Sequence, residues 1–155
     1  MFNMKIIVGS DHAAFKCFDI VINELESMGF ECLKCGAVNE DISIDYPKVA
    51  QEAVNEILKG NVAYGVLMCG TGIGISIAAN KFDGIRAALC HDDYTATMAK
   101  EHNNANILCM GGLVLDAEQI KGVIRTFFYA KWSNGERHAR RLSQISEIES
   151  YGKIS

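Results

Sequence analysis

The stretch Tyr64-Gly-Val-Leu-Met-Cys-Gly-Thr-Gly-Ile-Gly74 decides which fold this chain adopts. Its first six residues are a short apolar run of the kind that forms a buried β-strand. Gly70, Gly72 and Gly74 then predict a tight turn, and the apolar residues that continue to Lys81 predict a helix directly after it. A strand that passes through a turn into a helix is the building unit of parallel α/β sheets.

The same alternation of strand-like runs and helix-like stretches extends in both directions from this unit. Strands are predicted at residues 5–8, 30–33, 64–69, 85–89 and 107–110. Helices are predicted between and after them, at residues 15–25, 47–58, 74–81, 92–101 and 117–128. The chain is therefore expected to form one α/β domain over residues 1–155. We expect a three-layer Rossmann-like fold, with a five-stranded parallel sheet and helices on both faces.

The residues after Trp132 depart from this pattern. Ser133-Asn-Gly135 interrupts it, and residues 136–149 are a further helix candidate. Between Lys131 and Arg141 there are four basic residues and one acidic residue. Residues 132–155 are therefore expected to be a basic C-terminal helical extension at a subunit interface, although a solvated helix face has the same pattern.

Composition excludes several classes of protein. Apolar residues make up 49% of the chain, and no glycine period exists, so a disordered or collagen-like chain is excluded. No apolar run is long enough to span a membrane, and the first residues lack the layout of a signal peptide. The net charge of −4 argues against nucleic-acid or membrane binding but allows a local site for a small anion. We expect a cytoplasmic protein.

The chain contains six cysteines, at positions 17, 32, 35, 69, 90 and 109. The only C-x-x-C is Cys32-Leu-Lys-Cys35, and neither a second pair nor spaced histidines complete a zinc site. A redox C-x-x-C normally opens a helix, whereas this one closes a strand-like segment. Structural thiols and no metal are therefore expected, with a redox or metal pair as the alternative.

The glycine turn after Cys69 matches none of three familiar phosphate loops. A dinucleotide G-x-G-x-x-G needs glycine at position 75, a P-loop ends in lysine followed by serine or threonine, and a cysteine-phosphatase loop needs arginine at position 75. The chain has Ile75 followed by Ser76. What remains is a thiol at a strand end beside backbone N–H groups, which lower a thiol's pKa and make it a base. The alternative is a core cysteine followed by a tight turn.

Other polar residues follow predicted strands or end a predicted helix. Asp11 and His12 follow the first strand, so they lie at the same sheet edge as Cys69, where parallel sheets bind ligands. His102 ends the fourth predicted helix. Arg137 and Arg141 are four residues apart, so they share one helix face and could bind a phosphate. Each residue also has a purely structural interpretation. Asp11 could be a helix cap, His102 a helix-terminal histidine, and Arg137 and Arg141 part of a solvated basic face.

These segments together resemble the type B ribose-5-phosphate isomerase family, which includes galactose-6-phosphate isomerase. The most specific stretch runs from Cys69-Gly-Thr-Gly-Ile-Gly74 to Gly84-Ile-Arg86. The resemblance also covers Ser10-Asp-His-Ala-Ala14, Asp45-Tyr-Pro47, His102-Asn-x-x-Asn106 and Gly135-Glu-Arg-His138.

The resemblance implies an aldose–ketose isomerase, an intramolecular oxidoreductase that needs no metal or organic cofactor. It would interconvert D-ribose 5-phosphate and D-ribulose 5-phosphate in the non-oxidative branch of the pentose phosphate pathway. By family position, Cys69 would move the proton between C1 and C2, and His102 with Asp11 would open the sugar ring. The remaining positions would bind the substrate. The phosphate would be bound by His12, Arg137 and Arg141, and the sugar by Tyr46 and Asn103. The enediolate oxygens would be bound by Gly70, Thr71, Gly72, Ile73 and Gly74, and Thr71 would also assist catalysis. Family members are homodimers or tetramers whose sites lie at subunit interfaces.

One position departs from the family pattern. Many members carry an arginine where this chain has Leu113, and leucine cannot bind phosphate. Whether Arg140 compensates is open. A six-carbon substrate such as galactose 6-phosphate or allose 6-phosphate is therefore the main alternative, and a non-catalytic sugar-phosphate sensor is a remote one.

Overall fold

The computed structural model of the protein describes residues 3–154. Its strands are β1 (Lys5–Ser10), β2 (Glu31–Gly36), β3 (Tyr64–Cys69), β4 (Ala87–Leu89) and β5 (Ile107–Gly111). A 3-10 helix, η1 (His12–Cys17), precedes α1 (Phe18–Ser27), and the other helices are α2 (Tyr46–Leu58), α3 (Ile73–Ala79), α4 (Asp93–Glu101), α5 (Ala117–Tyr129) and α6 (Glu136–Tyr151). Every predicted strand and helix has a counterpart in this set.

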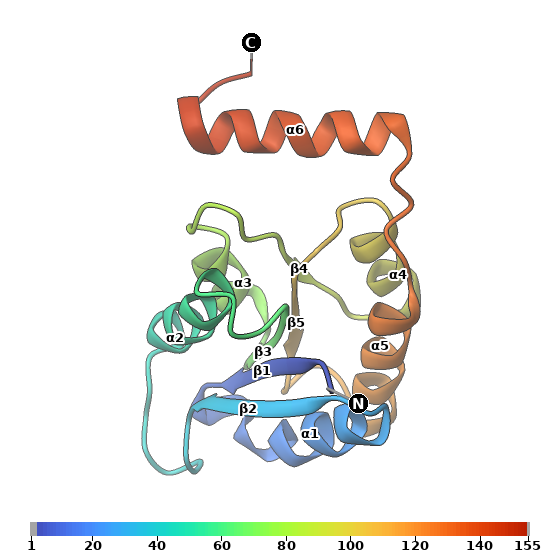
Figure 1. Cartoon of the computed structure of the whole chain (residues 1–155). Coiled ribbons are helices and arrows are strands. Elements are labelled where there is room, and N and C mark those ends of the chain that lie inside the picture. The colour runs from blue at the N-terminus through green and yellow to red at the C-terminus, as the bar shows by residue number, and fades with distance from the viewer. Residues whose placement is uncertain (1–2, 155) are drawn as a thin grey trace.

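The five strands form one parallel sheet in the order β2-β1-β3-β5-β4 (Figure 1). Successive residues of each strand face opposite sides, so each strand contributes to two cores. Val66 and Met68 pack with α1, α4 and α5, whereas Leu67 and Cys69 pack with α2 and α3. The predicted three-layer α/β fold with helices on both faces is confirmed.

Several boundaries differ from the prediction by one to three residues, and two of these differences have a clear physical cause. The fourth strand begins at Ala87 instead of Ile85, because the backbone N–H of Ile85 closes a turn onto the carbonyl of Phe82 at 3.2 Å. The segment before α1 is a 3-10 helix, which Asp11 caps by accepting a hydrogen bond from the Ala14 N–H at 3.1 Å. The alternative prediction for Asp11, that it caps a helix, is therefore confirmed.

The sheet has its switch point between β1 and β3. From β1 the chain moves outward to β2, and from β3 it moves the other way, toward β5 and β4. The Asp11 N–H donates to the Met68 carbonyl at 3.2 Å, and the Gly112 N–H donates to the Cys69 carbonyl at 2.9 Å. The carboxyl ends of β1, β3 and β5 thus meet at the place where open α/β sheets bind ligands.

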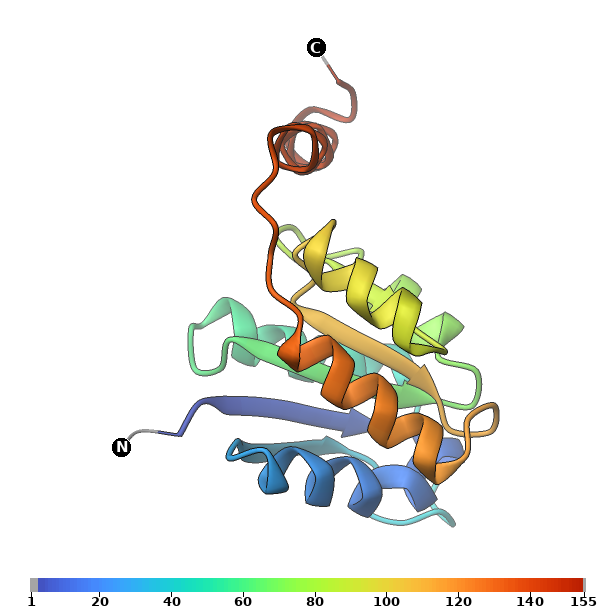
Figure 2. The same cartoon turned by 90° about the vertical axis from the view of Figure 1, so that its right-hand side faces the viewer.

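The C-terminal helix α6 stands apart from the layers. In Figure 2 it lies above the sheet and its covering helices, joined to α5 by an extended connection. The Gly84 N–H of the body donates to the Glu149 carboxylate of α6, at 3.3 Å to each oxygen. Ile145 and Ile148 of α6 remain about half exposed, at 39% and 48%. The predicted C-terminal helical extension is present, and within residues 3–154 no helix is long and apolar enough to cross a bilayer.

Candidate active site

The Cys69 thiol lies at the end of β3 under the glycine loop. Its Sγ accepts a hydrogen bond from the Gly72 N–H at 3.2 Å, and the side chain is 4% exposed. Gly72 adopts a left-handed conformation with φ of 77°, which turns its N–H back toward the sulfur. The sulfur therefore lies within reach of a backbone donor at the carboxyl end of β3.

The turn after β5 holds this loop in place. The Leu113 N–H donates to the Gly70 carbonyl at 3.0 Å. A Cβ on Gly111 would lie 2.7 Å from the carbonyl carbon and oxygen of Thr71, so the two backbones touch without an intervening side chain. The loop geometry therefore depends on the absence of a side chain at position 111.

Gly111→Ala is expected to displace the Thr71 peptide and with it the loop beside Cys69. Overpacking of this kind costs about 1–3 kcal/mol of unfolding free energy. A displacement of about 1 Å beside reacting groups lowers kcat/KM by up to about 10²-fold. Steady-state kinetics and thermal unfolding test both effects. The matched control is Gly122→Ala in helix α5, where the nearest new contact is the flexible Asp93 carboxylate at 3.2 Å, and it should retain activity.

Asp11, His12 and Tyr46 border the same sheet edge. His12 Nδ1 accepts a hydrogen bond from the Ile44 N–H at 3.3 Å, which places the proton of the neutral ring on Nε2. These three residues line a hollow of about 430 Å³. The Tyr46 ring packs on Gly74 so closely that a Cβ there would lie 2.6 Å from the ring. The predicted residues Asp11, His12, Tyr46 and Cys69–Gly74 thus form one cluster, which we call the thiol half-site.

A second cluster gathers the remaining predicted residues where α6 approaches α4. His102 stacks on His138 with ring centroids 4.1 Å apart and an interplanar angle of 15°. Arg137 donates from Nε to His138 Nε2 at 3.3 Å. Burial lowers the pKa of His138, and its neighbours His102, Arg137 and Arg141 lower it further. We call this cluster, with Asn103, the imidazole half-site, and its concentrated positive charge suits an anion.

Because the folded pKa of His138 lies below its ordinary value of 6.5, the unfolded chain binds more protons in the range between them. Stability therefore rises with pH through this range, and acidification from about pH 8 to about pH 5 should weaken the docking of α6. His138→Gln should remove this part of the pH dependence. The difference in Tm between the two proteins across that range is the measurement. A difference that stays constant with pH would contradict the prediction.

The two half-sites lie at opposite edges of the sheet. Cys69 ends β3, whereas the N–H of Gly65, four residues earlier, donates to the Asn106 carbonyl at 3.0 Å. Four strand residues span about 13 Å. Helix α4 starts after the carboxyl end of β4 and returns to the amino end of β5, so His102 at its end is far from Cys69. In Figure 2 the strand arrowheads point one way, and the connection to α6 rises from the other side.

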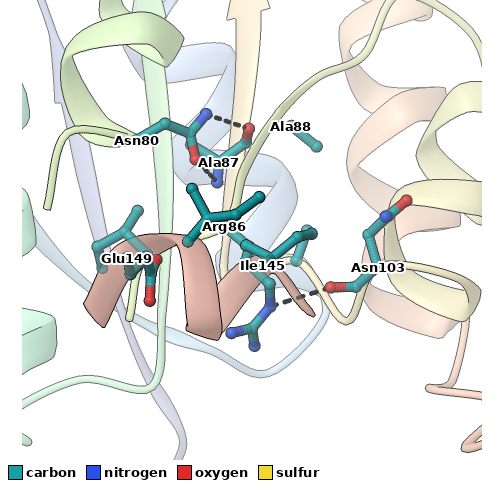
Figure 3. A pocket seen from close by; sticks show the side chains of 10 residues that line it. Asn80, Arg86, Ala87, Ala88, Asn103, Ile145 and Glu149 are labelled. Atoms are coloured by element: carbon teal, nitrogen blue, oxygen red, sulfur yellow. Dashed lines mark hydrogen bonds between the residues drawn. The ribbon is translucent and has the colours of Figure 1, made fainter. Parts of the chain in front are cut away.

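Asn103 lies beside a cavity of about 500 Å³ between α6 and the body of the protein (Figure 3). Arg86, Ile145 and Glu149 line the same cavity. Two residues near the imidazole half-site, His138 and Arg86, received no role from the sequence. Both stand inside quoted motifs, Gly135-Glu-Arg-His138 and Gly84-Ile-Arg86, which was the available signal.

Leu113 is 75% exposed at the rim of the thiol half-site, where its side chain lies near Gly70. This part of the rim is therefore apolar.

The Cys32–Cys35 pair has the properties of structural thiols. Burial, with nearby carboxylates, raises the pKa of Cys32 to about 11 and that of Cys35 to about 12. Few thiolates form at neutral pH under these conditions, which disfavours redox chemistry. Among residues 3–154, no group of three or more histidine, cysteine or acidic side chains is arranged to hold a metal ion.

Comparisons with known proteins cover nearly the whole chain. A family model described as Ribose/Galactose Isomerase matches residues 6–145. Ribose-5-phosphate isomerase B of Escherichia coli is 37% identical over 145 residues, which are 94% of this chain and 96% of that protein. The protein of the same name from Mycobacterium tuberculosis is 34% identical over 149 residues, which are 96% of this chain and 92% of that one.

Solved structures agree with the sequence comparisons. Ribose-5-phosphate isomerase B of Clostridium thermocellum superposes with a TM-score of 0.92 at 39% identity and covers 97% of this chain and 100% of that one. The type B ribose 5-phosphate isomerase of Trypanosoma cruzi gives a TM-score of 0.93 at 40% identity, covering 97% and 99% of the two chains. By sequence and by fold, this chain belongs to the ribose/galactose isomerase family.

Proposed function

We propose that the protein interconverts D-ribose 5-phosphate and D-ribulose 5-phosphate through an enediolate. The observation that carries this proposal is the hydrogen bond from the Gly72 N–H to Cys69 Sγ at the switch point of an isomerase fold. The relatives from Escherichia coli and Mycobacterium tuberculosis, which align over nearly their full length, are named for ribose 5-phosphate.

The chemistry begins with ring opening. His102 donates a proton to the ring oxygen while Asp11 accepts the proton of the C1 hydroxyl, so the ring C1–O bond breaks and a C1 carbonyl forms. Cys69 then removes the C2 proton as a thiolate, and negative charge develops on the C1 oxygen. Backbone N–H groups of residues 70–74, with Thr71, stabilise this oxygen. Return of the proton to C1, together with transfer of the C2-hydroxyl proton to the C1 oxygen, gives the ketose without any cofactor.

This chemistry requires Cys69 and His102 in one site, which the arrangement within one chain does not provide. We propose that two copies pair so that the thiol half-site of each faces the imidazole half-site of the other, and that the extension 132–155 lies at this interface. A two-fold pair gives two complete sites. Exposed apolar side chains flank both half-sites and would be buried by such pairing. They are Ile73, Ile77, Leu113 and Val114 near the thiol half-site and Ile145 and Ile148 on α6.

The test of the proposed reaction compares sugar phosphates. We expect kcat/KM for ribose 5-phosphate to exceed that for allose 6-phosphate and galactose 6-phosphate by about 10-fold or more, because the site must reject an extra hydroxymethyl group. A higher kcat/KM for either hexose phosphate would favour the second candidate, which the leucine at position 113 supports. Binding of sugar phosphates without turnover of any of them would instead indicate a sensor.

The proposed compartment is the cytoplasm. All six cysteines are free thiols, and at least four of them are buried, which suits a reducing compartment.

A further inference from the structure

The turn that follows α4 carries His102 and Asn103, and its backbone is held by a side chain from a distant part of the chain. Arg86 donates from Nε to the Asn103 carbonyl at 3.0 Å and to the Asn104 carbonyl at 3.1 Å. Its Nη2 also donates to the Asn104 carbonyl, at 2.9 Å. Carbonyl groups at a helix end lack partners within the helix and attract a cation, so the guanidinium satisfies them.

The conformation of this turn is one that the backbone does not favour on its own. Asn104 has a φ of +43°, in the left-handed region, where a residue other than glycine is uncommon. Surrounding contacts must hold such a residue in place. Arg86 supplies two of these contacts on the Asn104 carbonyl itself.

Asn106 fixes Arg86 from the other side. Its Oδ1 accepts a hydrogen bond from the Arg86 N–H at 2.8 Å, and its Nδ2 donates to the Gly84 carbonyl at 2.9 Å. The Asn106 N–H in turn donates to the Arg86 carbonyl at 3.0 Å. Backbone and side chain of Arg86 are thus both tied to the segment 103–106, so the motifs Gly84-Ile-Arg86 and His102-Asn-x-x-Asn106 are in direct contact.

We propose that Arg86 is a positioning residue for ring opening: its guanidinium holds the turn after α4 so that the His102 imidazole and Asn103 keep one orientation toward the substrate. This inference rests on the proposed function, because it assigns Arg86 a role through His102. The role proposed for Arg86 acts through the turn and needs no contact of its own with the substrate. The fork of Nε and Nη2 on one carbonyl is geometry that a lysine ammonium cannot reproduce, so charge alone does not suffice.

A kinetic signature separates this role from a purely structural one. An enzyme that cannot open the ring consumes only open-chain aldose, so its rate from ribose 5-phosphate levels off with rising enzyme concentration at the rate of spontaneous ring opening. The rate from ribulose 5-phosphate, which is already open, stays proportional to enzyme. Simple loss of stability lowers the amount of active enzyme and leaves both directions proportional.

The experiment measures initial rates in both directions against enzyme concentration for Arg86→Lys, Arg86→Met and Asn80→Ala. Asn80 is the matched control, because its side chain exchanges two hydrogen bonds of 2.8 Å with the backbone of Ala87, next to Arg86, and does not touch the turn. We expect both Arg86 variants to fall below proportionality from the aldose side, because their enzyme-catalysed ring opening is about 10- to 100-fold slower. Asn80→Ala should stay proportional even where its Tm falls equally.

Arg86 variants that stay proportional to enzyme from both sides, as Asn80→Ala does, would overturn the inference. His102→Asn serves as the benchmark and tests the proposed function separately. If it levels off and the Arg86 variants do not, the proposed function stands and the role of Arg86 fails. If His102→Asn also stays proportional, the assignment of ring opening to His102 is wrong, and the inference about Arg86 falls with it.

Discussion

Cys69→Ala is expected to lower kcat/KM for ribose 5-phosphate by about 10²–10⁴-fold, the usual contribution of a general base. The C2 proton of a sugar is only weakly acidic, so its removal needs both a base and stabilisation of the resulting oxyanion. The variant keeps the backbone donors of the glycine loop and loses the sulfur that receives the Gly72 N–H. The activity that remains in Cys69→Ala should therefore come from the backbone donors of the glycine loop alone. Substrate binding, measured by the shift in Tm on adding ribose 5-phosphate, should remain.

Cys109→Ala provides the matched control for this substitution. Cys109 is fully buried on the neighbouring strand β5 and packs in the same core as Cys69. Burial raises its pKa far above the ordinary thiol value, so it holds no thiolate at neutral pH. Its replacement should lower stability and leave kcat/KM nearly unchanged. If both variants retained wild-type turnover, Cys69 would have no part in the reaction.

The second large effect is expected when Cys69→Ala and His102→Asn chains are combined. Each variant alone should be nearly inactive. In a mixed pair, one site contains both substitutions, whereas the other contains the intact Cys69 of one copy and the intact His102 of its partner. Random pairing of equal amounts makes half of the pairs mixed, so the mixture should regain about a quarter of wild-type activity.

The control for this experiment places both substitutions in one chain and mixes it with wild-type chain. Every mixed pair then has one substitution in each of its sites, so mixed pairs should be inactive and only the wild-type pairs should contribute. Failure of the first mixture to regain any activity, although mixed pairs have formed by co-purification with two tags, would show that the two half-sites do not combine across copies.

Much of the fold could be predicted because local signals mark its boundaries. Asp92 and Asp116 cap α4 and α5 by accepting the N–H of Thr95 and Gln119, and each is an acidic residue directly before a periodic apolar segment. Gly29 and Gly60 adopt left-handed conformations after α1 and α2, which explains why the helices stop there. The later start of β4 was missed because Ile85, an apolar residue, closes the turn from Phe82 instead of opening the strand.

The candidate site was predicted as a set of residues but not as an arrangement. Resemblance to a family names Cys69 and His102 without saying that they lie at opposite sheet edges. Topology already contains this information, since a helix between two parallel strands must run back from the carboxyl edge to the amino edge. The contacts of Arg86 with Asn104 and of His102 with His138 join residues distant in sequence, and no local pattern encodes them.

The most direct test of the central claim is isomerisation of ribose 5-phosphate by the purified protein in deuterium oxide, with the products analysed by NMR. Proton transfer by Cys69 through an enediolate predicts ribulose 5-phosphate that carries solvent deuterium at C1, formed by the wild-type protein and lost with Cys69→Ala. Formation of the ketose with the original C2 hydrogen fully retained at C1, and equally fast in Cys69→Ala, would contradict it.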